Sequence, residues 1–141
     1  MFTKTAVFFS VLVSFVLTSS AFAELNMQDG KWEITTKVEM KGMHMEMPAT
    51  TFTQCITKKD AVPQNPEKGQ DCKITSTKVI GDTVTWTMQC KTKNGNMDSD
   101  GKITYKSNAF DGTMNMTMDN PKSGKMQMTQ HMTGKRIGDC K

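Results

Sequence analysis

Methionine and histidine gather in one short segment, residues 40–48, where methionines alternate around a single histidine. Three of the methionines lie on one side of an extended chain, ~6–7 Å apart by the rise of a strand. Thioether sulfur and imidazole nitrogen are the soft and borderline ligands that select Cu(I). The pattern therefore predicts a candidate Cu(I) or Ag(I) site, formed by Met43, His44, Met45 and Met47.

Two other interpretations of residues 40–48 stay open. The segment is also typical of a flexible apolar loop that packs over the mouth of a curled sheet, or of a contact with a ligand or partner. His131, beside Met132, would join the metal site only if the sheet closed. Five methionines near the end of the chain follow strand alternation, and we interpret them as core residues in place of leucine, because a flexible thioether fills irregular gaps. These are Met114, Met116, Met118, Met126 and Met128.

Four cysteines predict two disulfides, because the number is even and residues 1–23 have the pattern of an export signal. Their spacing contains no C-x2-C pair, which argues against a zinc site. Closing a loop of roughly 15–20 residues stabilises a fold by about 3 kcal/mol. Strand parity places Cys72 and Cys90 on one face, and Cys55 ends its strand near the same edge. All three pairings of Cys55, Cys72, Cys90 and Cys140 therefore stay open, and we favour the sequential one.

Residues for catalysis are sparse. The chain has two histidines and lacks the G-x-S-x-G, P-loop and H-E-x-x-H patterns. Asp98 and Asp100 share one face of a strand, where a solvated rim explains them better than an acid–base pair does. A cysteine held in a disulfide is not a thiolate nucleophile. We expect no enzyme activity and no cofactor other than the Cu(I) of the metal alternative.

Apolar residues recur at every second position in seven stretches, which is the signature of β-strands. Gly81-Asp82, Asn94-Gly95 and Ser107-Asn108 sit where hairpin turns are needed, and residues 58–62 suggest a helical turn. The expected fold is all-β: an antiparallel meander of about seven strands, curled or open and barrel-like, and disulfide-bonded. The inward side chains are expected to be Trp32, Ile34, Val38, Met40; Phe52, Ile56; Ile74, Ile80; Val84, Trp86, Met88; Ile103, Tyr105; Phe110, Met114, Met116, Met118; Met126, Met128, Met132.

The first 23 residues have the pattern of a cleaved signal peptide. Lys4 precedes an apolar run, residues 6–17, which is too short to span a bilayer, and Ala21-Phe22-Ala23 is an A-x-A cleavage site. Residues 24–141 are then one β domain outside the cytoplasm, periplasmic or secreted, with no transmembrane segment. The net charge of +4 is spread along the chain, so no basic patch suggests nucleic acid.

Five short motifs run in order through the domain: G-K-W-E-I at 30–34, the methionine segment at 40–48, T-Q-C-I at 53–56, D-C-K-I at 71–74, and T-G-K-R-I-G-D-C at 133–140. Together they resemble the bacterial exported family called Domain of Unknown Function 3617. The resemblance implies a small envelope protein of Gram-negative bacteria with four paired cysteines, and it supplies no activity, substrate or catalytic residue. The methionine load of the last strands is heavier than the family pattern requires.

We therefore expect a non-catalytic binding or envelope-maintenance protein that holds a small apolar ligand or an envelope partner. The alternative is a soft-metal protein that uses residues 40–48.

Overall fold

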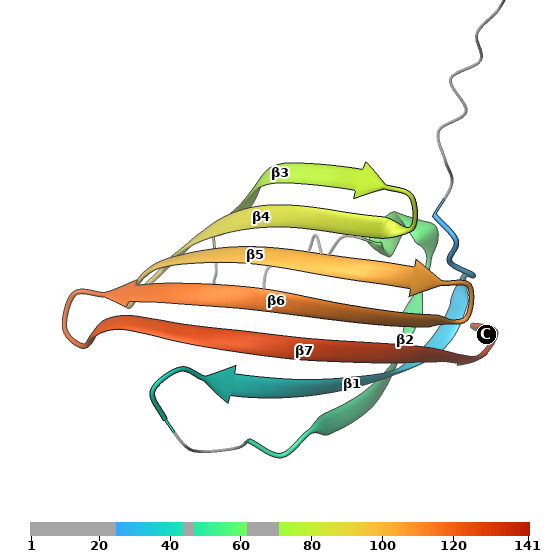
Figure 1. Cartoon of the computed structure of the whole chain (residues 1–141), viewed down its shortest axis with the longest axis horizontal. Coiled ribbons are helices and arrows are strands. Elements are labelled where there is room, and N and C mark those ends of the chain that lie inside the picture. The colour runs from blue at the N-terminus through green and yellow to red at the C-terminus, as the bar shows by residue number, and fades with distance from the viewer. Residues whose placement is uncertain (1–24, 44–46, 62–70) are drawn as a thin grey trace, which may run out of the picture.

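The computed structural model describes residues 25–43, 47–61 and 71–141. Seven antiparallel strands form one sheet, which curls in Figure 1. Within these ranges no helix is long and apolar enough to cross a membrane. The predicted signal peptide, residues 1–23, lies outside the described residues. The elements are β1 (Gly30–Met40), β2 (Thr50–Ile56), the 3-10 helix η1 (Lys58–Asp60), β3 (Asp71–Ile80), β4 (Thr83–Thr92), β5 (Gly95–Lys106), β6 (Ala109–Asn120) and β7 (Gly124–Gly138).

The strand order is β2-β1-β7-β6-β5-β4-β3. Strands β3 to β7 follow one another as a meander, with turns at residues 81–82, 93–94, 107–108 and 121–123. β1 then pairs with β7, and β2 pairs with the other side of β1. β2 and β3 are the two edges, so the described strands form an open, curled sheet (Figure 1). The expected fold class is confirmed.

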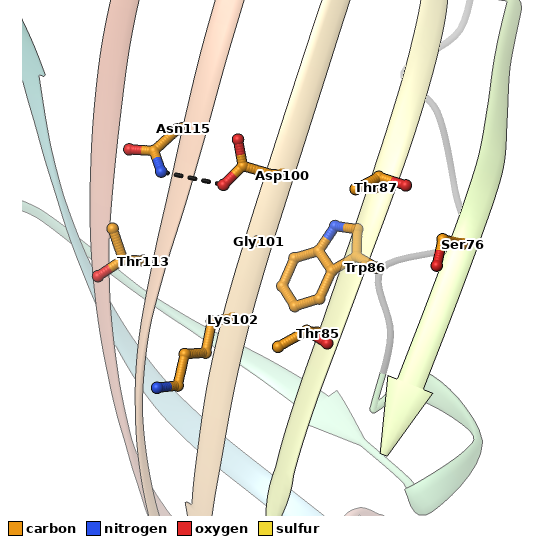
Figure 2. A pocket seen from close by; sticks show the side chains of 9 residues that line it. All are labelled: Ser76, Thr85, Trp86, Thr87, Asp100, Gly101, Lys102, Thr113 and Asn115. Atoms are coloured by element: carbon orange, nitrogen blue, oxygen red, sulfur yellow. Dashed lines mark hydrogen bonds between the residues drawn. The ribbon is translucent and has the colours of Figure 1, made fainter. Parts of the chain in front are cut away.

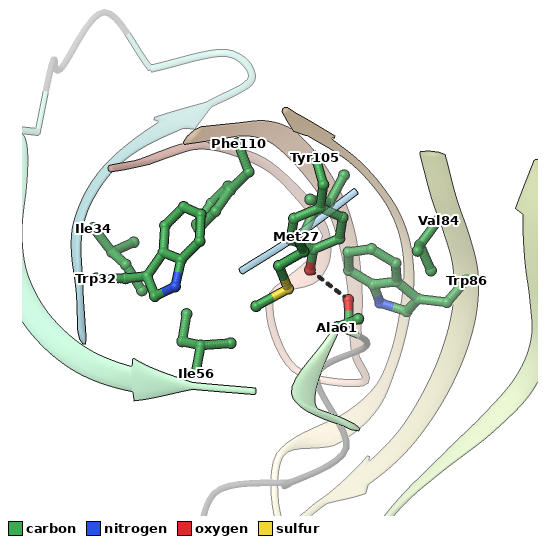
Figure 3. Packing of buried hydrophobic residues seen from close by; sticks show 10 residues of the cluster. Met27, Trp32, Ile34, Ile56, Ala61, Val84, Trp86, Tyr105 and Phe110 are labelled. Carbon is green, nitrogen blue, oxygen red and sulfur yellow. Dashed lines mark hydrogen bonds between the residues drawn. The ribbon is translucent and has the colours of Figure 1, made fainter. Parts of the chain in front are cut away.

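The core fills one end of the concave face. Trp32 and Phe110 pack with ring centroids 5.5 Å apart, and Tyr105 meets Phe110 edge-on at 5.8 Å (Figure 3). Gly134 lies directly opposite Phe110 across the β6–β7 pair, where a Cβ atom would overlap the ring. The glycine therefore provides the space that the aromatic side chain occupies. The buried cluster is Met27, Trp32, Ile34, Ile56, Ala61, Val84, Trp86, Ile103, Tyr105 and Phe110.

Two segments outside the strands cover this end of the core. Met27, before β1, is 3 % exposed, and the neighbouring Gln28 backbone N–H donates to the Ser107 carbonyl at 3.0 Å. Ala61, after η1, accepts a hydrogen bond of 2.7 Å from the Tyr105 hydroxyl (Figure 3). Burial, with a smaller contribution from the charge of Asp60, raises the pKa of Tyr105 to about 12. The expected helical turn after β2 is confirmed as η1.

The two disulfides are Cys55–Cys140 and Cys72–Cys90. The favoured sequential pairing, which joins the first cysteine to the second and the third to the fourth, is therefore wrong. Cys72 and Cys90 are direct partners across β3 and β4, as strand parity predicted. Cys55 does not join them, because β2 and β3 are opposite edges of the sheet. β1 lies between β2 and β7 and brings the chain after β7 close to the end of β2, where Cys140 reaches Cys55.

One predicted inward residue points the other way. The β3–β4 register shifts between Ile74 and Ser76, which inserts one extra residue into β3. After the shift Val79, not Ile80, is the partner of Val84. Ile80 is therefore 65 % exposed, and its expected place on the core face is wrong.

Candidate functional site

The concave face beyond the aromatic core is lined by methionine. On β6 and β7, Met116 lies directly opposite Met128, and Met118 opposite Met126. β1 adds Met40, the partner of Met128, and β5 adds Met97, the partner of Met118. Direct partners in an antiparallel pair point to the same face, so these side chains form one continuous patch over four strands. We call it the methionine surface: Met40, Met97, Met116, Met118, Met126 and Met128.

The methionine surface is only partly buried. Met126 is 37 % exposed, and the other five members are half-buried. Three further methionines, Met88, Met114 and Met132, pack against the aromatic cluster. The core interpretation thus holds for Met114, whereas Met116, Met118, Met126 and Met128 lie outside the buried cluster. Met40 was predicted to face inward and to begin the segment at residues 40–48, whereas Met97 was missed, although its parity on β5 could have indicated it.

The predicted metal segment is only partly within the described residues. Met43 and Met47 are 52 % and 44 % exposed, whereas His44 and Met45 lie outside the described ranges. The Met43 backbone N–H donates to the Met40 carbonyl at 3.4 Å, so the turn after β1 starts at the rim of the methionine surface. The two described side chains are accessible there, and the four predicted ligands stay a hypothesis.

His131 does not join this segment. It follows the outward parity of β7, lies opposite Lys37 on β1, and places Nε2 3.8 Å from a carboxylate oxygen of Glu39. The condition under which His131 would join the predicted metal site is not met, because the sheet is open and strand alternation puts His131 on the convex face. Across the described ranges, no three His, Cys, Asp or Glu side chains gather as a metal-binding group.

The convex face is polar and supported by hydrogen bonds between neighbouring strands. The Asn115 side-chain amide donates to Asp100 at 3.0 Å, and the Thr129 hydroxyl donates to the Asn115 amide oxygen at 3.1 Å. A hollow of about 390 Å³ lies on this face (Figure 2). Asp98 shares the outward parity of Asp100 as expected, and both are exposed. The hollow is lined by Ser76, Thr85, Trp86, Thr87, Asp100, Gly101, Lys102, Thr113 and Asn115.

The described part of the buried cluster contains one unpartnered polar side-chain atom. The Nε1–H of Trp86, a side chain only 2 % exposed, is buried without a hydrogen-bond partner among the residues that the structure describes. Trp32, equally buried, donates its Nε1–H to the Gln28 carbonyl at 3.2 Å. Trp86 lies over Gly101, where a Cβ atom would overlap the indole ring, and Met88 is the next inward residue on β4.

Comparisons with curated proteins and with solved structures found no match. A family model described as "Protein of unknown function (DUF3617)" matches residues 27–140. The match includes all seven strands, both disulfides and every member of the methionine surface. The chain belongs to the DUF3617 family.

Proposed function

We propose that this chain is an exported, non-catalytic binding protein of the bacterial envelope whose methionine surface holds a small apolar ligand. The observation that carries the proposal is the half-exposed methionine surface, which continues the buried core along the concave face of an open sheet. Contiguous exposed apolar surface on a small domain marks a site of interaction. Methionine suits such a site, because its flexible side chain adapts to ligands of different shape.

Two features of the chain support export: the N-terminal pattern and the paired cysteines. The N-terminal residues 1–23 have the pattern of a signal peptide, and all four cysteines of the remaining domain are paired. Disulfides persist in oxidising compartments, and the family resemblance implies the envelope of Gram-negative bacteria. Together these features favour the periplasm as the location of residues 24–141.

A non-catalytic role is supported by the state of the reactive side chains. The cysteines are in disulfides, so none supplies a thiolate. His131 is on the convex face beside Glu39, far from the apolar concave side on which a ligand would lie. Asp100 is exposed and accepts a hydrogen bond from Asn115. These groups resemble a solvated sheet surface more than an acid–base pair.

The size of the surface sets the expected affinity. Fully burying a methionine side chain contributes about 1.5–3 kcal/mol, so six side chains that are each about a third exposed at most leave no more than about 3–6 kcal/mol to a ligand. Association costs offset part of this gain. We therefore expect weak binding, with a Kd of roughly 1 mM or higher from this surface alone.

The test is a titration of the oxidised protein with a fluorescent fatty acid. Met116→Gln/Met128→Gln places two amides at the centre of the surface and should weaken binding at least tenfold. Met43→Gln is the matched control, since Met43 is exposed and outside the surface, and it should bind like the wild type. Equal affinity of the double variant and the wild type would exclude this surface as the binding site.

The second candidate function is soft-metal binding by the segment at residues 40–48. It is favoured by the exposure of Met43, which follows β1, and of Met47, which precedes β2. Thioethers and imidazole suit Cu(I) and Ag(I). Met43→Leu/Met45→Leu/Met47→Leu should then lose competition against a chromogenic Cu(I) chelator, and undiminished competition would end this candidate.

A further inference from the structure

Methionine is distributed over this fold in a way that core packing does not explain. The buried cluster has ten members, of which Met27 alone is a methionine. The centre of the core uses aromatic and β-branched side chains instead, such as Trp32, Val84 and Ile103. Six methionines lie together where burial is partial. A side chain chosen only to fill gaps would be most useful inside the cluster.

The centre of the methionine surface is a block of four side chains on two adjacent strands. Met116 faces Met128, and Met118 faces Met126, in two consecutive inward positions of β6 and β7. Cβ atoms of direct partners are ~5 Å apart and those of inward neighbours along a strand ~7 Å, so each lies ~4 Å from the middle of the block. Flexible side chains can turn all four sulfur atoms toward that point.

We propose that the thioethers of Met116, Met118, Met126 and Met128 bind one monovalent soft cation, Cu(I) or Ag(I), above the β6–β7 pair. Thioether sulfur is selective for such ions and a poor ligand for Zn²⁺, Mg²⁺ or Ca²⁺. Within the chain no free thiol competes, because every cysteine is in a disulfide. Met40 and Met97, the direct partners of Met128 and Met118, flank the block on its two sides.

This site differs from the segment at residues 40–48, because it needs neither His44 nor Met45 and is built on paired strands. It shares the exposed methionine surface with the proposed function but depends on a different property. An apolar ligand requires a hydrophobic side chain, whereas the cation requires sulfur. Replacing methionine by leucine keeps the hydrophobic side chain and removes the sulfur, so apolar-ligand binding and cation binding can be tested separately.

The experiment is a Cu(I) titration of the oxidised full-length domain, residues 24–141, with bicinchoninate as competing chelator and ascorbate as reductant. Wild-type protein should withdraw one Cu(I) per chain. The variant Met116→Leu/Met118→Leu/Met126→Leu/Met128→Leu should bind at least tenfold more weakly. The matched control, Met88→Leu/Met114→Leu/Met132→Leu, replaces methionines that pack against the core and should retain wild-type affinity.

A second measurement observes the site directly. In protein labelled with 13C at the methionine methyl groups, one equivalent of Ag(I) should shift the signals of Met116, Met118, Met126 and Met128, and leave those of Met88 and Met132 in place. The proposal is overturned if wild-type protein takes no Cu(I) from the chelator, or if the four-leucine variant competes equally well. Binding of the fluorescent fatty acid to that variant reports separately on the proposed function, which should be intact.

Discussion

Trp32 and Trp86 form a matched pair for measuring the effect of a buried, unpartnered N–H on this fold. Both indole rings are almost fully buried, at 0 % and 2 % exposure. Trp32 donates its Nε1–H to the Gln28 carbonyl, and Trp86 has no acceptor within the described ranges. Phenylalanine at either position removes the N–H together with a similar amount of ring volume. The difference between the two variants therefore reports on the hydrogen bond.

The expected difference follows from the two environments. A typical hydrogen bond contributes about 0.5–1.5 kcal/mol, and a buried donor without a partner costs about 1–3 kcal/mol. Trp32→Phe loses the stabilisation from a hydrogen bond, whereas Trp86→Phe removes the cost of a buried donor without a partner. We expect Trp32→Phe to lower the free energy of unfolding by about 2 kcal/mol more than Trp86→Phe does, which corresponds to a difference of about 8 °C in Tm for a domain of this size.

The assay is urea unfolding of the oxidised variants followed by far-UV circular dichroism, since each substitution removes a fluorescent tryptophan. Equal m-values for the two variants would show that the same surface is exposed on unfolding. An equal or larger loss of stability in Trp86→Phe refutes the reasoning, because it would mean that the Trp86 N–H contributes as a satisfied donor does.

Three further predictions follow from the core and the disulfides. Because the pKa of Tyr105 is raised to about 12, the folded state keeps a proton that the unfolded chain loses near pH 10; stability should fall by roughly 2–3 kcal/mol between pH 10 and 12, and Tyr105→Phe should flatten that part of the pH profile measured by urea unfolding. Replacing Cys72 and Cys90 together by alanine opens a loop of sequence separation 18 and should cost about 3 kcal/mol; an unchanged urea midpoint would contradict a stabilising role for this bridge. Gly134→Ala would force a Cβ atom into the ring of Phe110 and should lower stability by about 1–3 kcal/mol, and a thermal melt identical to that of the wild type would show that the ring moves aside freely.

Local pattern was enough to predict the strands and most of their faces. Val84, Trp86 and Met88 alternate along β4 as expected, because the two-residue period of a strand is a property of the chain itself. The turns were also predictable from local sequence, because glycine readily adopts the positive φ that hairpin turns require. Gly81 and Gly95 have φ values of 57° and 137°. The face of Ile80 could not be predicted from the alternation, because a single inserted residue in β3 moves every later side chain of that strand to the opposite face of the sheet.

The pairing of distant segments depended on the tertiary structure. Nothing near Cys55 or Cys140 in the sequence shows that β1 inserts between β2 and β7, and that insertion decides which disulfides form. The same arrangement brings Met40 beside Met128. Composition revealed an excess of methionine, but only the register between β1, β7, β6 and β5 showed that six of these side chains form one half-exposed surface. A contact between residues far apart in the chain is set by sheet topology, which the alternation within each strand does not encode.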